Sequence, residues 1–438
     1  MAKKEKHTKK ERKWYRLDNA ATIYPVMSNR SWMAMFRLCA TLTEEVDKDI
    51  LEEALRSTVT RFPTMTVRVR RGFFWHYLEH VDGIPPVTLD VANPCLPVNK
   101  KENNGFLFRV RYYKCRIALE FFHVLTDGSG GMCFLKTLVA EYLRLRYGTD
   151  VPRGATIMDC SQPPRPEELE DSFPKFSGKV PLARGESKAY HLKGTKEHKE
   201  FMNITTGIID SAAVARKAKE IGVSVTHYLC AVLIQSIADI QRKDRRRGPR
   251  KKPIKICVPV NLRRIFGSST VRNFSSYVNP GIERKYGEYS LAETAKIVQH
   301  QMGLETTPQH LRAKFTANVQ AETNPLIRMV PLFVKIMILQ IVYRATGDVQ
   351  TTSTISNLGI VNLPEEMENH VERLDFQLGP LFQNKVTCAA VSYKDKLYIN
   401  FTRKLRESDV ERGFFTRLVE EGIPVTIESN MSERSLME

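Results

Sequence analysis

The chain has 438 residues, of which 42% are hydrophobic and 26% charged, and its net charge is +18. A chain of this length and composition can bury a sizeable core. This predicts two domains or one large bilobal unit and excludes an intrinsically disordered protein. The charge is uneven: residues 1–16 carry eight Lys and Arg against two Glu, and residues 242–255 carry nine against one Asp, which leaves +4 for the remainder.

The two basic runs predict little about the fold but restrict the partners. Such runs are typical of a solvated tail or loop, or of segments attracted to an acidic carrier protein, an anionic membrane surface or the phosphates of coenzyme A. We do not expect nucleic acid as a partner, because no helix-turn-helix, zinc-finger or RNA-recognition signature accompanies the charge.

The cysteines and the start of the chain predict the compartment. Residues 1–16 are charged and polar, with no apolar segment behind them, so we expect no secretory signal. The eight cysteines form no C-x-x-C pair and no Cys/His ligand pattern, which predicts free thiols, no metal site and a cytoplasmic location. Peripheral attachment to a membrane stays open.

The first part of the chain is predicted to be a basic disordered tail (1–13) followed by a half of mixed structure (14–150). Its expected helices are an amphipathic one capped by Asp47 and one ended by Gly148, over residues 47–61 and 132–147. The expected strands are 65–69 and 73–80, with a hairpin over 106–122.

A segment rich in Pro, Glu, Lys and Ser, residues 151–200, is predicted to be a crossover linker to a second half, residues 201–438. In that half we expect helices over 210–221, 226–243 and 409–421, and strands over 255–260, 350–356, 371–378, 385–393 and 396–401. Strands and helices follow one another in mixed order in both halves. This order predicts an α/β or α+β fold with antiparallel hairpins, not a doubly wound parallel sheet.

Residues 330–343 are strongly apolar but contain Lys335 and Gln340. Fourteen residues are too few to cross a bilayer, which takes about 20. The segment is therefore predicted to be a packed helix. The alternative is an interfacial helix that serves a lipid-like substrate.

The pattern H-x-x-x-D-G occurs once, as His123, Asp127 and Gly128, directly after a predicted apolar strand. A histidine held at such a strand end can act as a general base, because its pKa lies near neutrality. Asp127 can fix the loop that aims the ring, and glycine tolerates backbone angles that other residues resist. The pattern alone also fits a histidine buried in the core with its hydrogen bonds satisfied.

Four segments in order make the sequence, from about residue 14 to 428, resemble the chloramphenicol-acetyltransferase-like superfamily of CoA-dependent acyltransferases. It looks closest to the bacterial alcohol acetyltransferase-like proteins. The segments are F-F-H-V-L-T-D-G-S-G-G (121–131), V-P-V-N-L-R-R-I-F with R-N-F (258–266, 272–274), T-I-S-N-L-G (354–359) and D-F-Q-L-G-P (375–380).

This resemblance implies a bilobal fold of two similar mixed-sheet halves that meet at a central tunnel. It implies acyl transfer from a CoA thioester to an alcohol, or to an amine, by direct attack with His123 as the general base. Acyl-CoA, or the phosphopantetheine of an acyl carrier protein, would be a co-substrate, with no permanently bound cofactor and no metal.

For the other site residues, the resemblance implies mainly structural roles. Asp127 would pair with an arginine, best matched by Arg263 and next by Arg264. Gly128 would act as a hinge that needs the backbone freedom of glycine, and Asn273 would support a loop. Ser356 falls where the family places a hydroxyl near the oxyanion. Its close competitors are Thr352, Ser353 and Thr354.

One departure from the family pattern bears on the reaction. Condensation domains usually carry H-H-x-x-x-D-G, and here Phe122 stands in place of the first histidine. Two alternatives stay open beside a CoA-dependent enzyme. One is a carrier-protein-dependent or condensation-like enzyme that acts on a lipid, sugar or peptide. The other is a non-catalytic scaffold or peripheral membrane protein.

Overall fold

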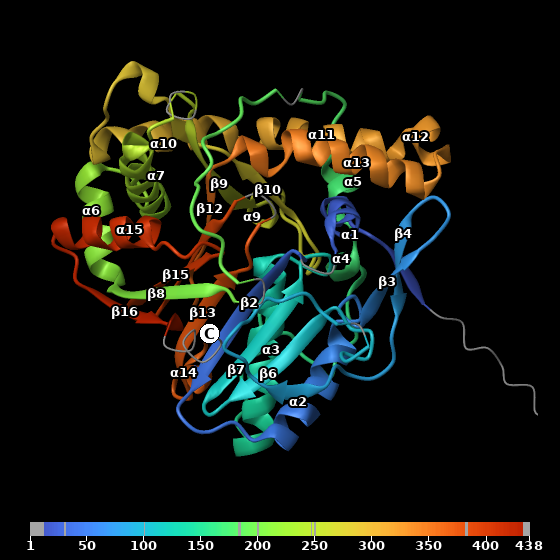
Figure 1. Ribbon diagram of the computed structural model, residues 1–438. Coiled ribbons are helices and arrows are strands. Elements are labelled where there is room, and N and C mark those ends of the chain that lie inside the picture. Colours follow the sequence, from blue (N-terminus) through green and yellow to red (C-terminus); the bar gives the residue numbers. More distant parts are fainter. Residues whose placement is uncertain are drawn as a thin grey trace, which may run out of the picture.

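The structure, a computed structural model, describes residues 13–29, 32–99, 101–182, 185–198, 201–246, 248, 251–381 and 384–431. Most of the predicted tail 1–13 and part of the basic run 242–255 lie outside these residues. The described chain forms two lobes, each a mixed sheet covered by helices, as predicted from the sequence (Figure 1).

The sheet of the first lobe has five strands in the order β13-β2-β7-β6-β5. Their bounds are β2 (Met35–Leu42), β5 (Val87–Leu89), β6 (Phe108–Tyr113), β7 (Arg116–Phe122) and β13 (Val371–Leu378). A small sheet, β1-β4-β3, lies beside it, with β1 (Trp14–Arg16), β3 (Val67–Arg71) and β4 (His76–His80). The β6–β7 pair is the hairpin that the sequence predicts over residues 106–122.

The larger sheet has the order β10-β9-β12-β14-β15-β8-β16, and β11 also pairs with β9. The bounds are β8 (Asn203–Asp210), β9 (Ile254–Asn261), β10 (Ser275–Val278), β11 (Gly281–Ile282), β12 (Ser353–Ile360), β14 (Val386–Tyr393), β15 (Lys396–Arg403) and β16 (Val425–Ser429). Only β12 pairs in parallel here, with β9 and β14, so antiparallel pairs dominate as expected.

Helices cover both sheets. In the first lobe they are α1 (Ile23–Met27), α2 (Lys48–Arg61) and α3 (Gly128–Tyr147). In the second they are α6 (Ser211–Ile221), α7 (Val225–Lys243), α9 (Arg263–Phe266), α10 (Leu291–Glu305), α11 (Pro308–Thr323) and α15 (Asp409–Glu420). After α11, the helices α12 (Pro325–Met329) and α13 (Leu332–Thr346) lead to α1, and α14 (Glu365–Glu368) lies against β13 of the first lobe. The predicted linker contains α4 (Pro166–Leu169) and α5 (Ser172–Phe176).

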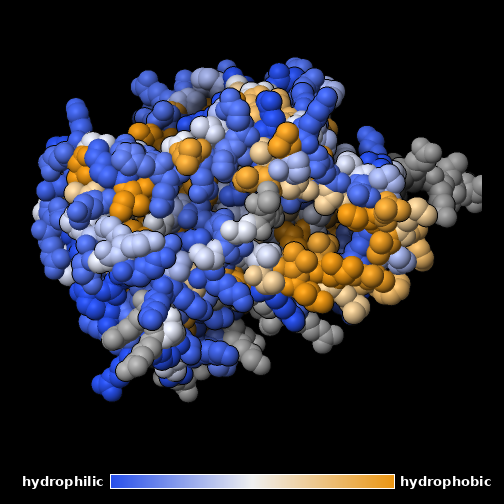
Figure 2. Space-filling view, turned by 90° about the horizontal axis from the view of Figure 1, so that it is seen from above, coloured by the Kyte–Doolittle hydropathy of each residue, from blue (hydrophilic) through white to orange (hydrophobic). Residues whose placement is uncertain are grey.

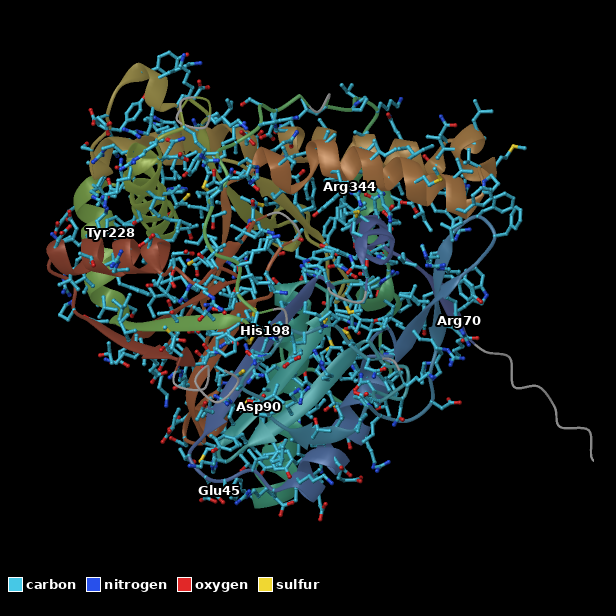
Figure 3. All side chains as sticks on the ribbon, viewed as in Figure 1. Glu45, Arg70, Asp90, His198, Tyr228 and Arg344 are labelled. Carbon is cyan, nitrogen blue, oxygen red and sulfur yellow. The ribbon has the colours of Figure 1, made fainter. Side chains whose placement is uncertain are left out.

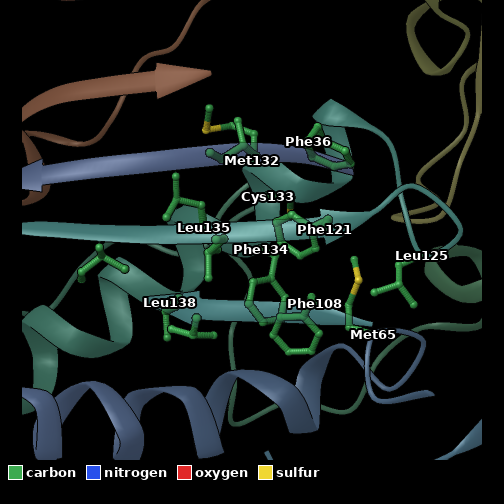
Figure 4. Close-up of a cluster of buried hydrophobic side chains, with 14 of the residues drawn as sticks. Phe36, Met65, Phe108, Phe121, Leu125, Met132, Cys133, Phe134, Leu135 and Leu138 are labelled. Carbon is green, nitrogen blue, oxygen red and sulfur yellow. The ribbon is translucent and has the colours of Figure 1, made fainter. Parts of the chain in front are cut away.

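The core of the first lobe is an aromatic cluster between its sheet and the helices α2 and α3 (Figure 4). The ring of Phe134 in α3 lies 5.0 Å from that of Phe62, 5.4 Å from that of Phe108 and 5.8 Å from that of Phe121. Buried aromatic side chains of this size dominate the energy of a core. They fix α3, and with it the loop that carries His123, against the sheet.

The helix bounds follow capping chemistry. The Asp47 side chain accepts hydrogen bonds from two backbone N–H groups at the start of α2, and Gly222 ends α6 in the left-handed conformation, as predicted. The predicted start of α3 at residue 132 is wrong: the helix begins at Gly128, because the Asp127 side chain caps it through the N–H groups of Ser129 and Gly130.

Strand β13 belongs to the sheet of the first lobe, although its neighbours in sequence, β12 and β14, belong to the larger sheet. It follows β12 in sequence, but it pairs antiparallel with β2, with Leu374 opposite Ala40 and Phe376 opposite Leu38. The two sheets therefore do not coincide with the residue ranges 14–150 and 201–438, because the later range supplies one strand to the earlier lobe.

The apolar segment 330–343 does form a helix, α13. Its inward face buries Leu332 and Lys335, whereas Phe333, Met337 and Ile341 are exposed. Among the described residues, no single helix has the length and hydrophobicity that a bilayer crossing needs. The bent pair α6 and α7 meets those criteria only when the two helices are taken together.

Candidate active site

His123 lies directly after β7, where the first lobe meets the second. Its backbone N–H donates to the carbonyl of Ala34 at 2.8 Å, so the chain position is fixed by the sheet. The ring of Tyr24 stacks on the imidazole at a centroid distance of 4.8 Å, and the ring of Phe36 meets it edge-on at 5.3 Å. The residue as a whole remains partly exposed.

Asn273, which is 150 residues further along the chain, holds the imidazole. Its Nδ2 donates to the carbonyl of His123 at 2.9 Å and to Oδ2 of Asp18 at 3.2 Å. Because both partners only accept, the amide orientation is determined, and Oδ1 faces Nδ1 of His123 at 3.0 Å. Nδ1 therefore carries the hydrogen, and Nε2 keeps its lone pair.

Two opposing effects act on the pKa of His123. Burial lowers this pKa below its usual value, and the nearby negative charge of Asp127 raises it by a smaller amount. The net lowering keeps the imidazole neutral at physiological pH. A neutral ring with a free Nε2 is the form that can take a proton.

Asp127 is fully occupied by other partners. Its Oδ1 accepts from the N–H groups of Ser129 and Gly130, each at 3.1 Å. Its Oδ2 accepts from Arg263 at 2.8 Å and from the N–H of Phe274 at 2.9 Å. The charge of Arg263 and these hydrogen bonds outweigh burial and lower the pKa of Asp127. The carboxylate thus ties the start of α3 to the second lobe.

Arg263 is the arginine that meets Asp127, and the other candidate, Arg264, is exposed. The guanidinium of Arg263 also donates to the carbonyl of Thr270 at 2.6 Å and to the carbonyl of Arg272. These bonds shape the loop that presents Asn273. One ion pair therefore positions both α3 and the residue that holds the imidazole.

The glycines after Asp127 are needed for space. Gly128 does not have a positive φ, so the expected hinge role, based on backbone freedom, is wrong. A Cβ on Gly128 would lie 2.9 Å from the side chain of Leu358 in β12. A Cβ on Gly130 would lie 2.2 Å from both the Thr126 hydroxyl and the Val271 carbonyl, so the two lobes touch through these glycines.

We expect Gly130→Ala to lower the free energy of unfolding by about 3 kcal/mol, the upper end for overpacking, because a backbone carbonyl cannot move aside as a side chain can. Gly303→Ala is the matched control, since Gly303 lies in α10 with open space around its Cβ position. That change should stabilise the protein by about 0.5–1 kcal/mol. Urea unfolding of both variants tests this, and equal effects would contradict it.

Ser356 lies in β12, two residues before Leu358, the residue that approaches Gly128. Its hydroxyl has no hydrogen-bond partner in the described part of the chain. Two of its competitors do have partners: the Ser353 hydroxyl donates to the Val386 carbonyl at 2.8 Å, and the Thr352 hydroxyl accepts from the N–H of Lys255 at 3.3 Å. The Thr354 hydroxyl is buried without a partner among the described residues.

An acidic residue that no sequence motif marks, Asp18, lies behind Asn273. Asp18 is fully buried, and burial raises its pKa to about 6 against the opposing charge of Arg272. Arg272 also donates to the carbonyl of Arg16 at 2.6 Å. Asp18 stands in the loop after β1, in a stretch without any motif, so no sequence signal could have found it.

In the part of the chain that the structure describes, the cysteines and the other polar side chains add no second candidate centre. None of the eight cysteines there forms a disulfide bond. Among the residues that the structure describes, no three His, Cys, Asp or Glu side chains come close enough to hold a metal ion.

The comparisons with known proteins give the fold. No family model matches the sequence, and no curated protein is detectably similar to it. Solved structures do match. Polyketide synthase associated protein 5 from Mycobacterium tuberculosis is 12% identical, with a TM-score of 0.61 over 92% of this chain and 96% of that one.

Two further matches are proteins from Fusarium sporotrichioides. TRI3 trichothecene 15-O-acetyltransferase has a TM-score of 0.60 and 12% identity over 95% of this chain and 96% of that one. TRI101, solved with coenzyme A and T-2, has a TM-score of 0.61 and 13% identity over 91% and 96%. The first condensation domain of the CDA synthetase also matches, with a TM-score of 0.56 and 12% identity over 93% and 96%. The chain thus has the two-lobed fold of CoA-dependent acyltransferases and condensation domains.

Proposed function

We propose that this protein is an acyltransferase that moves an acyl group from a CoA thioester to an alcohol, or secondarily to an amine. The observation that carries the proposal is the His123–Asn273 hydrogen bond at the junction of the lobes, which leaves Nε2 as a free base. The fold adds support, since its neighbours include an acetyltransferase and a protein solved with coenzyme A. The likeness to bacterial alcohol acetyltransferase-like proteins stays a prediction.

In the proposed mechanism, Nε2 of His123 takes the proton of the acceptor hydroxyl as its oxygen attacks the thioester carbonyl carbon. The tetrahedral intermediate then collapses, the carbon–sulfur bond breaks, and the imidazolium returns the proton to the leaving thiolate, which yields an ester and free CoA. Asn273 keeps the hydrogen on Nδ1 throughout. Asp127 takes no part in proton transfer, because all its acceptor positions are used.

Two related assignments belong to the same proposal. Both substrates would reach His123 through a tunnel between the lobes, with the donor and the acceptor on opposite sides. An acyl carrier protein is the second candidate donor, and the basic run 242–255 would suit its acidic surface. Phe122 in place of a second histidine argues against peptide condensation.

The direct test mixes the purified protein with acetyl-CoA or longer acyl-CoA and a panel of alcohols and amines, and follows free CoA with a thiol reagent. We expect acceptor-dependent release, together with an ester product detected by mass spectrometry. Acyl-loaded carrier protein in a parallel reaction distinguishes the two donors. Absence of acceptor-dependent release with every donor would overturn the proposal.

Ser356 is proposed to donate a hydrogen bond to the oxyanion. We expect Ser356→Ala to lower kcat by about 10²–10³-fold, the usual loss for one oxyanion donor, with KM little changed. Ser353→Ala is the control. It should keep its kcat and lose about 1 kcal/mol of the free energy of unfolding, because that hydroxyl bonds the backbone. Unchanged kcat in Ser356→Ala would remove this residue from the mechanism.

Asn273 is proposed as a positioning residue, and its test is the pH profile of kcat/KM. Neutral His123 is the base, so the rate should rise with pH through the pKa of His123, which lies below the usual 6.5, and then stay flat. In Asn273→Ala, kcat should fall by up to about 10²-fold as the ring loses its orientation.

In the wild type, the hydrogen bond to Asn273 favours the protonated ring and raises the pKa of His123. Asn273→Ala removes this bond, so the pKa of His123 should fall and the acid limb of the profile should move to lower pH. Asn279→Ala, in which a buried amide loses its contact with Glu186, should keep the wild-type profile. An unmoved limb in Asn273→Ala would leave Asn273 with a structural role only.

A further inference from the structure

A continuous apolar surface covers α12, α13 and the tip of the β3–β4 hairpin (Figure 2). We call it the apolar platform. Its exposed members are Phe73, Phe74, Leu326, Ile327, Met329, Phe333, Met337, Ile338, Ile341 and Val342. On α13, Phe333, Met337 and Ile341 repeat every four residues and are 67%, 62% and 66% exposed, so the stripe follows one face of the helix.

The platform is held from beneath by polar groups. The ammonium of Lys335 is buried: it donates to the carbonyls of Phe74 at 3.1 Å and Arg328 at 3.3 Å, and it lies 3.5 Å from the ring centroid of Trp75. Gln340 donates to the carbonyl of Val26 in α1 at 3.0 Å. Lys335 and Gln340 thus anchor an inner face that also packs Leu332, Ile336 and Leu339 against the protein, while the outer face of the helix remains largely apolar.

The extent of the platform calls for a partner. From their exposed fractions, the ten side chains present on the order of 1,000 Å² of apolar surface, and soluble monomers rarely expose more than a few hundred Å² in one patch. We propose that the platform docks on an anionic lipid bilayer, with α12, α13 and the hairpin tip inserted into the interface.

The charges around the platform favour an anionic surface. The segment from Asn324 to Thr346 contains no carboxylate, and its exposed cations are Arg328 and Arg344, since Lys335 is buried. Arg71 at the end of β3 and Arg328 in α12 are exposed and form no ion pair within the described residues. Arg344 on α13 is also exposed, whereas Arg70 on the hairpin pairs with Glu79 at 2.8 Å (Figure 3). The exposed arginines form a positive rim that attracts acidic headgroups, and the apolar side chains can then enter the acyl region.

The start of the chain can strengthen the same contact. Residues 1–12 carry six Lys and Arg against two Glu. The described chain begins beside the hairpin, since Trp14 of β1 pairs with Glu79 of β4. Twelve residues span up to about 40 Å when extended, so their cations have the length to reach the surface on which the platform lies.

A second copy of the chain suits the platform less well. A two-fold interface would bring each patch against itself and its cationic rim against the same rim. Arg71 and Arg328 would then face like charges across the interface, which costs free energy rather than adding it. A bilayer with acidic lipids offers the opposite charge around an apolar interior.

The test is co-sedimentation of the full chain with phosphatidylcholine vesicles that contain about one third phosphatidylserine, compared with vesicles of phosphatidylcholine alone. The platform variant is Phe333→Asp with Ile341→Asp. The control variant is Val180→Asp with Leu304→Asp, at two side chains that are 75% and 71% exposed and lie outside the platform. A third variant lacks residues 1–12. Thermal unfolding checks that all are folded.

We expect the wild type and the control variant to bind the acidic vesicles equally, and the platform variant to lose at least tenfold in partition coefficient. The variant without residues 1–12 should bind more weakly but still better than the platform variant. Equal binding by the platform variant and the wild type would overturn the proposal. So would equal binding to both kinds of vesicle, or a wild-type dimer in sedimentation velocity that the platform variant loses without vesicle binding. None of these outcomes depends on acyltransferase activity.

Discussion

Replacing His123 by alanine should lower acceptor-dependent release of CoA by about 10²–10⁴-fold, the usual loss when a general base is removed. The structure gives the reason: Nε2 is the free nitrogen of a ring whose Nδ1 is bound to Asn273. The affinity for acyl-CoA should change little, because the base acts on the acceptor. Stopped assays for free CoA measure the first quantity, and calorimetric titration with acyl-CoA measures the second.

His227→Ala is the matched control for that experiment. Its ring accepts from the N–H of Ser224 at 3.4 Å and caps α7, so its loss should cost stability and leave the chemistry intact. Full activity in His123→Ala would remove the proposed mechanism. A loss of activity in both variants to the same degree would point to unfolding as its cause, which thermal denaturation would reveal.

Asp127→Ala is expected to have the largest effect on stability, a loss of about 3–5 kcal/mol in the free energy of unfolding. The substitution leaves the partly buried guanidinium of Arg263 without its carboxylate partner. It also removes the side chain that caps α3 and the acceptor for the N–H of Phe274. Asp127→Asn should not rescue it. One amide oxygen can keep the cap, but the amide nitrogen would then face the donors of Arg263 and Phe274.

The double variant Asp127→Ala, Arg263→Ala tests the cause. Its loss should be smaller than the sum of the two single losses, because removing both partners leaves no stranded charge. Glu53→Ala, which breaks an exposed pair with Arg56, should change stability by less than about 0.5 kcal/mol. Urea unfolding is measured for the wild type, Asp127→Ala, Arg263→Ala, the double variant and Glu53→Ala, and additive losses would show that the two side chains act separately.

Helices, hairpins and strands that are specified by residues close together in the chain were predicted well from the sequence. The helix capped by Asp47, the hairpin before His123 and the strand 371–378 all have their expected places in the chain. Each is specified by a cap, a turn or an alternating pattern within about twenty residues. The role predicted for Gly128 was wrong. In a sequence, glycines after an aspartate indicate a turn, and only the structure shows that Gly128 and Gly130 lie against Leu358 and Val271 of the second lobe.

What the sequence did not predict depends on contacts across the fold. Asn273 was placed in a supporting loop, but its bond to His123 joins residues 150 positions apart. Asp18, which bonds the same amide, carries no motif at all. For residues 330–343 the sequence left a packed helix and an interfacial helix open, because the composition of an apolar helix does not say which of its sides the rest of the chain covers.

The placement of β13 has a consequence for the synthesis of the chain. Until Val371–Leu378 has been made, the first lobe has β2 as an open edge, eight residues long and mostly apolar. Long apolar edges recruit other strands, so nascent or truncated chains that end before Val371 are expected to aggregate. The chain enters this strand from β12 and leaves it toward β14, so β13 also ties the two lobes together, and any hinged opening would have to stretch these connections or break the pairing with β2.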